Sequence, residues 1–147
     1  LESANIPLFI HCETLQLPVI KSISSQHHKI KIIIDHMGRV NSKNGIASPS
    51  FMNLLTLAEF ANIYIKISST NYFAEVSDTH SDLSDFVSII LQKFSADRLL
   101  WGSDWPFSEN DGTYASSIEP LLSMKLTDRE NTLKKIFHIN FKELLNA

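Results

Sequence analysis

Short apolar runs recur along the chain, and longer amphipathic stretches separate them. Four runs predict strands: Ile6–Ile10, Lys31–His36, Ile63–Ser69, and a run from Leu99 that stops near Asp104. Their continuous apolar character is typical of strands buried on both faces of a parallel sheet. Pro7 fits such a strand only near its start, and Pro106 cannot continue a ladder, so the fourth strand ends before it.

Apolar residues at helical spacing fill the segments between the strands. The predicted helices cover Leu17 to about Ser25, Phe51–Phe60, about Asp82 to Phe94, about Ser116 to Met124, and a last helix from Thr127 to Leu145 that breaks near His138. Ser50 is the expected N-cap of the second helix, and Thr127 with Glu130 has the form of a capping box. This alternation predicts an α/β fold of right-handed βαβ units around one parallel sheet.

Composition narrows the class of protein. The 147 residues are 44% hydrophobic and 20% charged, which suits a single domain with a real core. A formal net charge of −3 argues against a nucleic-acid partner, and no apolar run is long enough for a membrane span. One cysteine, Cys12, excludes an internal disulfide. We therefore expect a cytoplasmic protein that acts on a small molecule.

Three of the predicted strands end in groups that bind metals or move protons: His11, His36 and Asp104. The carboxyl ends of parallel strands lie on one edge of a sheet, so residues distant in sequence converge there. Two imidazoles and a carboxylate suit a divalent ion such as zinc or manganese. They equally suit a metal-free site in which Asp104 is a base and His36 polarises a carbonyl. The pattern leaves both readings open.

Each candidate also has an ordinary structural reading. His11 could be a histidine with satisfied hydrogen bonds at a strand end, and Asp104 could bond only nearby backbone. Gly38 permits a tight turn beside His36. Arg39 and Tyr72 could hold a substrate carboxylate or carbonyl, or could anchor loops instead.

Two kinds of potential nucleophile are expected to have structural rather than catalytic roles. Ser68 and Ser69 are expected to bond backbone rather than to attack a substrate. Cys12 is expected to be an inert buried thiol, because nothing nearby in sequence activates it.

Several of these residues lie in segments that resemble a known family. The segments Ile34–Arg39, Lys66–Ser68 and Leu100–Pro106 resemble the amidohydrolase-related family, which includes 2-pyrone-4,6-dicarboxylate lactonase-like hydrolases and carboxymuconate-semialdehyde decarboxylase-like enzymes. The ending Ile139–Leu145 resembles that family's closing helix, which contains an asparagine. The resemblance implies a TIM-type (β/α)8 barrel, with these strands as its fifth to eighth.

The resemblance also implies roles for the strand-end residues. His11 matches the fifth-strand metal ligand of the metal-dependent members. His36 matches the sixth-strand histidine that polarises the substrate or activates water. Asp104 matches the eighth-strand aspartate, a metal ligand or proton acceptor. The implied activity is hydrolysis of a lactone or amide, or a related decarboxylation, with zinc, manganese or no metal.

The chain departs from the family pattern in three places. The His-x-His pair of the first strand does not occur anywhere in this sequence. Phe107 stands where many lactonase-like members have a histidine, and Phe73 stands where they often have an arginine. Both changes weaken the case for a dicarboxylate lactone as substrate.

The length of the chain suggests how it relates to the whole barrel. A barrel of this type needs about 250 residues, and this chain begins at Leu1 in what resembles the tail of a helix. We therefore expect residues 1–147 to form one partial domain, the carboxyl-terminal half of a barrel. Alone it is expected to be inactive, and to need the amino-terminal half or to self-associate through its open edges. The alternative is a non-catalytic binding module or a degenerate half-barrel.

Overall fold

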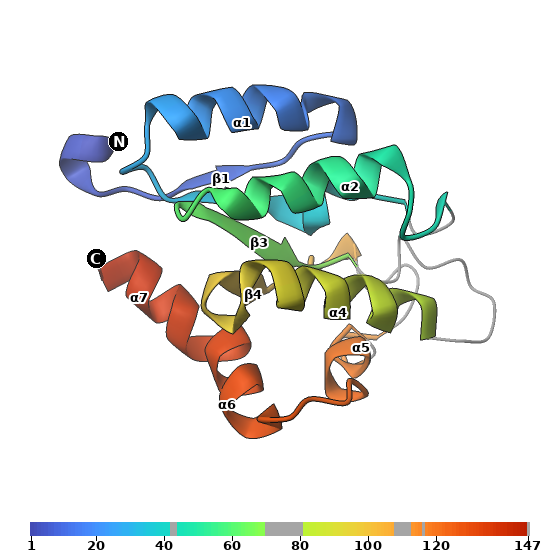
Figure 1. Ribbon diagram of the computed structural model, residues 1–147. Helices are drawn as coiled ribbons and strands as arrows, with labels where there is room; N and C mark the ends of the chain where they lie inside the picture. Colours follow the sequence, from blue (N-terminus) through green and yellow to red (C-terminus); the bar gives the residue numbers. More distant parts are fainter. Residues whose placement is uncertain (42–43, 70–80, 108–112, 116, 147) are drawn as a thin grey trace.

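The fold is built on a four-stranded parallel sheet in the order β1-β2-β3-β4 (Figure 1). The structure, a computed structural model, describes residues 1–41, 44–69, 81–107, 113–115 and 117–146. The strands are β1 (Leu8–Ile10), β2 (Ile32–Ile34), β3 (Ile63–Ile67) and β4 (Leu99–Trp101). The register pairs Phe9 with Ile33, Ile33 with Tyr64, and Lys66 with Leu100. All four predicted strands are confirmed, although each is shorter than its apolar run suggests.

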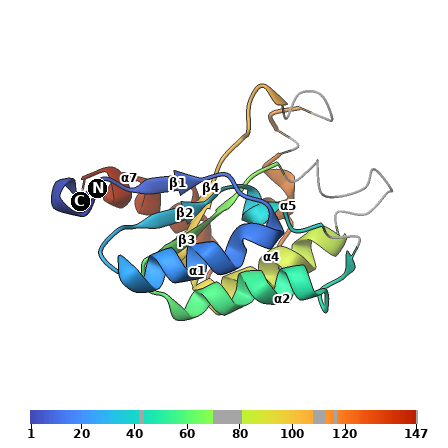
Figure 2. The ribbon, with the colours of Figure 1, turned by 90° about the horizontal axis from the view of Figure 1, so that it is seen from above.

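Three helices cover one face of this sheet. They are α1 (Leu17–Gln26), α2 (Pro49–Thr56) and α4 (Ser81–Phe94). Successive strands pair in chain order, so each right-handed crossover steps the same way and leaves its helix on the same face. Figure 2 shows the three helices side by side along that face. This single-sided winding is the arrangement of a barrel wall rather than of a doubly wound sheet.

The sheet packs against these helices through alternate residues. In β3, Ile63, Ile65 and Ile67 are fully buried, whereas Tyr64 and Lys66 between them are partly exposed. The buried set joins a core with Phe51 of α2 and Phe94 of α4, both fully buried. At about 25 cal/mol per Å² of apolar surface, such side chains each contribute roughly 1.5–3 kcal/mol to stability.

The carboxyl-terminal segment packs beside β4 and reaches the opposite face of the sheet. It comprises α5 (Glu119–Leu122), α6 (Arg129–Lys134), a π-helical segment η8 (Lys135–Ile139) and α7 (Asn140–Asn146). Leu144 of α7 is buried against Ile33 and Leu100, which point away from α1, α2 and α4. The break predicted near His138 is therefore a π segment, which reorients α7 toward the second face.

Two predicted helix starts are wrong in detail. Ser48, not Ser50, caps α2, and its Oγ accepts a hydrogen bond from the Phe51 backbone N–H at 3.4 Å. Pro49 explains the shift, because proline suits the first position of a helix, where its missing N–H costs nothing. The capping box at Thr127 does not form, since α6 begins at Arg129 without a side-chain cap.

Short 3₁₀ turns accompany these elements: η1 (Glu2–Ala4), η2 (Thr14–Gln16), η5 (Leu57–Glu59) and η6 (Ala96–Arg98). The turn η3 (Asp35–Arg39) differs from them, because its backbone is left-handed from His36 to Gly38. The two outer strands, β1 and β4, pair on one side only among the strands that the structure describes. Self-association through these edges stays a prediction. Over the described ranges, no helix combines the length and apolar character that a membrane crossing requires.

Candidate active site

The carboxyl edge of the sheet brings the predicted chemical groups together. His11 follows β1, His36 follows β2, and Asp104 lies three residues beyond the end of β4. His36 Nε2 lies 3.7 Å from Asp104 Oδ1. The ring of His11 makes an edge contact with that of His36, with centroids 5.0 Å apart. The convergence expected from parallel topology is therefore present.

Two serines after β3 complete this group, and sequence reasoning assigned them to the backbone. Ser68 Oγ lies 2.8 Å from His36 Nδ1, and Ser69 Oγ lies 3.0 Å from the same nitrogen. Ser69 Oγ also donates a hydrogen bond to Asp104 Oδ2. Their place in the sequence could have indicated this, because the two hydroxyls directly follow β3, which pairs with β2, and His36 follows β2. We call His36, Ser68, Ser69 and Asp104 the serine-bridged cluster.

The backbone at this edge is left-handed at three of the four residues of the serine-bridged cluster. The φ angles are +53° at His36, +53° at Ser69 and +58° at Asp104. Non-glycine residues rarely adopt this conformation, and each instance costs on the order of 1–3 kcal/mol. The turn after β2 also suits Gly38, whose φ is +64° and where an added Cβ would lie 3.2 Å from Leu17 Cδ2 of α1. Strained residues of this kind concentrate at functional sites, which supports a functional interpretation.

Burial and charge act together on His36. The side chain is 11% exposed, and burial lowers the pKa of His36 below the ordinary histidine range, with the nearby Asp104 carboxylate acting against that shift. Lys66 also acts to lower the pKa of His36, and its Nζ is 2.8 Å from Asp35 Oδ1. Because desolvation is the largest of these effects, this environment favours the neutral imidazole.

Arg39 is placed beside His11 rather than in open solvent. Its Nη1 donates to His11 Nε2 at 3.2 Å, and its Nε lies 3.1 Å from Glu13 Oε1. A guanidinium only donates, so His11 Nε2 accepts this hydrogen bond. The substrate-binding role of Arg39 stays a prediction. Tyr72, the other predicted substrate contact, lies outside the described residues.

The donors at this edge do not by themselves fit a metal ion. Among the residues that the structure describes, no three histidine, cysteine or acidic side chains are placed to hold one. The lone pair of His11 Nε2 faces the Arg39 guanidinium, and Asp104 Oδ2 accepts from Ser69. A catalytic zinc site usually takes three protein ligands. His11 and Asp104 therefore supply at most part of such a ligand set.

Cys12 is adjacent in sequence to His11 but does not join the cluster. Its side chain is buried at 4% exposure, and burial raises the pKa of the Cys12 thiol to about 11. Only the thiolate is a strong nucleophile. The expected inert role of Cys12 agrees with this environment.

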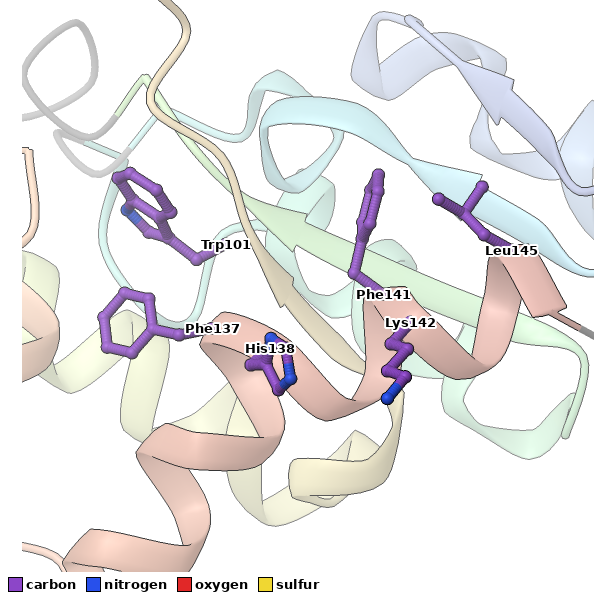
Figure 3. Close-up of a pocket in the computed structure, with 6 residues that line it drawn as sticks. All are labelled: Trp101, Phe137, His138, Phe141, Lys142 and Leu145. Atoms are coloured by element: carbon purple, nitrogen blue, oxygen red, sulfur yellow. The ribbon is translucent and has the colours of Figure 1, made fainter.

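A separate pocket of about 460 Å³ lies beside β4 and the carboxyl-terminal helices (Figure 3). Its lining is mainly apolar, with the rings of Trp101, Phe137 and Phe141 and the side chain of Leu145. His138 and Lys142 add its polar groups. Nothing in the serine-bridged cluster lines this pocket, so the two features are distinct.

Comparison with known proteins places these observations in a family. A family model described as amidohydrolase matches residues 1–146. The 4-sulfomuconolactone hydrolase of Rhizobium radiobacter is 38% identical over 77 residues, which cover 52% of this chain and 25% of that protein. The L-fucono-1,5-lactonase of Burkholderia ambifaria is 29% identical over 101 residues, covering 67% of this chain and 34% of that protein.

The fold is also similar to solved structures that carry the amidohydrolase description. A crystal structure of an amidohydrolase from Burkholderia multivorans superposes with a TM-score of 0.82 at 16% identity, covering 99% of this chain and 55% of that one. The chain thus spans about half the length of this structure and has the fold of half a TIM-type barrel.

Proposed function

The chain belongs to the amidohydrolase family, and on that premise we propose that the protein hydrolyses the ring ester of a lactone at the serine-bridged cluster. The observation that carries this proposal is the approach of His36 Nε2 to Asp104 Oδ1 at the carboxyl edge of the sheet. Two of the relatives at 29–38% identity are named as enzymes that act on lactones, which supports the same bond type.

Hydrolysis of a lactone needs two proton transfers. The attacking water must lose a proton to become a stronger nucleophile, and the alkoxide that leaves must gain one. A carboxylate such as Asp104 accepts a proton from the attacking water and passes it to the ring oxygen as the ring opens. The 3.7 Å between His36 Nε2 and Asp104 Oδ1 is too long for a direct hydrogen bond and leaves both atoms open to one small ligand. His36 therefore contacts either the attacking water or the substrate carbonyl.

The charged groups near the cluster suggest what the substrate carries. Among the described residues, Lys66 is paired with Asp35 and Arg39 is paired with Glu13. Phe107, 64% exposed, follows Asp104 where a histidine is common in lactonase-like members. These features support a lactone with little negative charge over a dicarboxylate.

The test is hydrolysis of a panel of γ- and δ-lactones, neutral and carboxylated, by the protein expressed from its complete coding sequence. We expect turnover of a neutral lactone, and a fall of about 10²–10⁴-fold in kcat on His36→Asn substitution. His28→Asn, at an exposed histidine, is the matched control and should leave kcat unchanged. Turnover of amides with none of lactones, or an unaffected His36→Asn variant, would contradict the proposal.

Metal dependence is a separate part of the proposal, and this chain's residues predict weak binding. His11 and Asp104 supply two ligands at most, and both already accept hydrogen bonds from the protein. Calorimetry of residues 1–147 with zinc or manganese should show no tight stoichiometric binding. Tight binding that His11→Ala abolishes would mean that the ligand set is complete within this chain.

A further inference from the structure

The hydroxyl of Ser69 occupies a position between the two catalytic candidates. Its Oγ contacts His36 Nδ1 at 3.0 Å and donates to Asp104 Oδ2. An ionised carboxylate has no proton to give, so the hydrogen in the bond between Ser69 and Asp104 belongs to Ser69. A serine hydroxyl carries one hydrogen only, and that hydrogen is already used. Toward His36, Ser69 can therefore only accept.

This constraint bears on which ring nitrogen of His36 carries the proton. With the proton on Nδ1, that N–H donates to Ser69 and is shared with Ser68, whose Oγ lies 2.8 Å away. With the proton on Nε2, that N–H faces Asp104 Oδ1 at 3.7 Å, which is beyond hydrogen-bond length. The lone pair of Nδ1 then faces the lone pair of Ser69 Oγ at 3.0 Å, so of the two hydroxyl contacts only that of Ser68 is favourable. The first arrangement makes both hydroxyl contacts favourable, whereas the second makes one of them repulsive.

We infer that Ser69 is a positioning residue that holds neutral His36 with its proton on Nδ1 and leaves Nε2 as an acceptor facing Asp104. The tautomer follows from the serine contacts alone, and only the identity of the ligand that Nε2 binds rests on the proposed function. With Nε2 and Asp104 Oδ1 both acceptors 3.7 Å apart, the group that fits between them is a donor of two hydrogens. The attacking water has that property, whereas a substrate carbonyl has none.

His36 thus holds the attacking water rather than polarising the carbonyl. The water donates one hydrogen to His36 Nε2 and one to Asp104 Oδ1, which aims its lone pair away from both. As the oxygen bonds to the carbonyl carbon, Asp104 takes one proton, and the electron pair of the carbonyl moves to its oxygen. The electron pair on that oxygen then re-forms the carbonyl as the ring carbon–oxygen bond breaks, and the proton passes from Asp104 to the alkoxide. Asp104 is ionised again, and His36 keeps its proton on Nδ1 throughout.

The backbone supports a dedicated role for Ser69. Its φ of +53° is unfavourable for serine. His36 and Asp104, the two residues that Ser69 connects, also have left-handed φ angles. The residue type does not explain this conformation, because glycine, asparagine and aspartate favour the left-handed region and serine does not. The strained turn directs the hydroxyl to the two partners together.

The first test reads the tautomer directly, in the protein expressed from its complete coding sequence with ¹⁵N-labelled histidine. His36 resonances are assigned by their loss in His36→Asn, and spectra are recorded where His36 is neutral. We expect a pyrrole-type signal at Nδ1 and a pyridine-type signal at Nε2. The reverse pattern in the unaltered protein would show Ser68 donating to Nδ1 and would overturn the inference.

The second test uses matched substitutions. Ser69→Ala frees His36 Nδ1 for Ser68 and should move the population toward the Nε2–H form, with kcat reduced on the order of 10–100-fold and KM less affected. Ser69→Thr keeps a hydroxyl and should restore the Nδ1–H pattern. Ser25→Ala, which removes an exposed hydroxyl on α1, should change neither. An unchanged tautomer in Ser69→Ala would overturn the role of Ser69.

The two tests separate this inference from the proposed function. The expected tautomer together with its reversal in Ser69→Ala would support the inference even if no lactone were hydrolysed. Lactone turnover accompanied by an Nε2–H tautomer would support the function and overturn the inference, because His36 would then present a donor to the carbonyl.

Discussion

Replacing Asp104 with asparagine is expected to lower kcat for lactone hydrolysis by about 10²–10⁴-fold, the range that general acid–base groups usually contribute. The amide has the shape of the carboxylate, but it cannot take a proton from water. Its oxygen can still accept the hydrogen bond that Ser69 donates to Oδ2. The loss should therefore fall on kcat rather than on folding or on KM.

The control for this prediction is Asp128→Asn, at an exposed carboxylate that precedes α6. It removes the same charge from the protein without touching the carboxyl edge of the sheet. Steady-state kinetics of both variants, together with thermal unfolding, should show a large fall in kcat for Asp104→Asn alone and similar melting temperatures. Full activity of Asp104→Asn would mean that the carboxylate does not receive the proton, and the mechanism proposed for this site would be wrong.

The strands could be predicted because burial on both faces demands apolar runs, and Ile32–Ile34 is fully buried. Their lengths could not be predicted, because the polar residues at the ends look like further strand positions. Ser69 and Asp104 instead leave the sheet through left-handed turns. The cap of α2 shows the same limit, since two serines flank Pro49 and only the first is the N-cap.

Some contacts of the candidate site could also be predicted from the sequence, and others could not. The approach of His36 to Asp104 follows from parallel topology, because both residues leave strands of one polarity. The serine contacts do not follow from that topology, because they depend on the turn at Ser69, a conformation that serine rarely adopts. The roles of His11, Arg39 and Tyr72 stay predictions.

The closing helix supplies the prediction with the largest expected effect on stability. Asn140, at the first position of α7, is 3% exposed, and its Nδ2 donates to the backbone carbonyls of Ala96 at 2.6 Å and Leu99 at 2.7 Å. Those carbonyls lie at η6 and at the start of β4, so one side chain joins the last strand to the last helix. Asn140→Ala leaves both acceptors without this donor.

Each buried polar group left without a partner costs about 1–3 kcal/mol, so Asn140→Ala should lower the free energy of unfolding by about 2–4 kcal/mol. Asn140→Asp should cost at least as much, because an ionised carboxylate only accepts and would face two carbonyl oxygens. Asn131→Ala, at an exposed asparagine of α6, should change stability by less than about 0.5 kcal/mol. Urea unfolding monitored by tryptophan fluorescence measures all three. Equal midpoints for Asn140→Ala and Asn131→Ala would show that Asn140 does not hold β4 to α7, and that packing by Leu144 against Ile33 and Leu100 suffices.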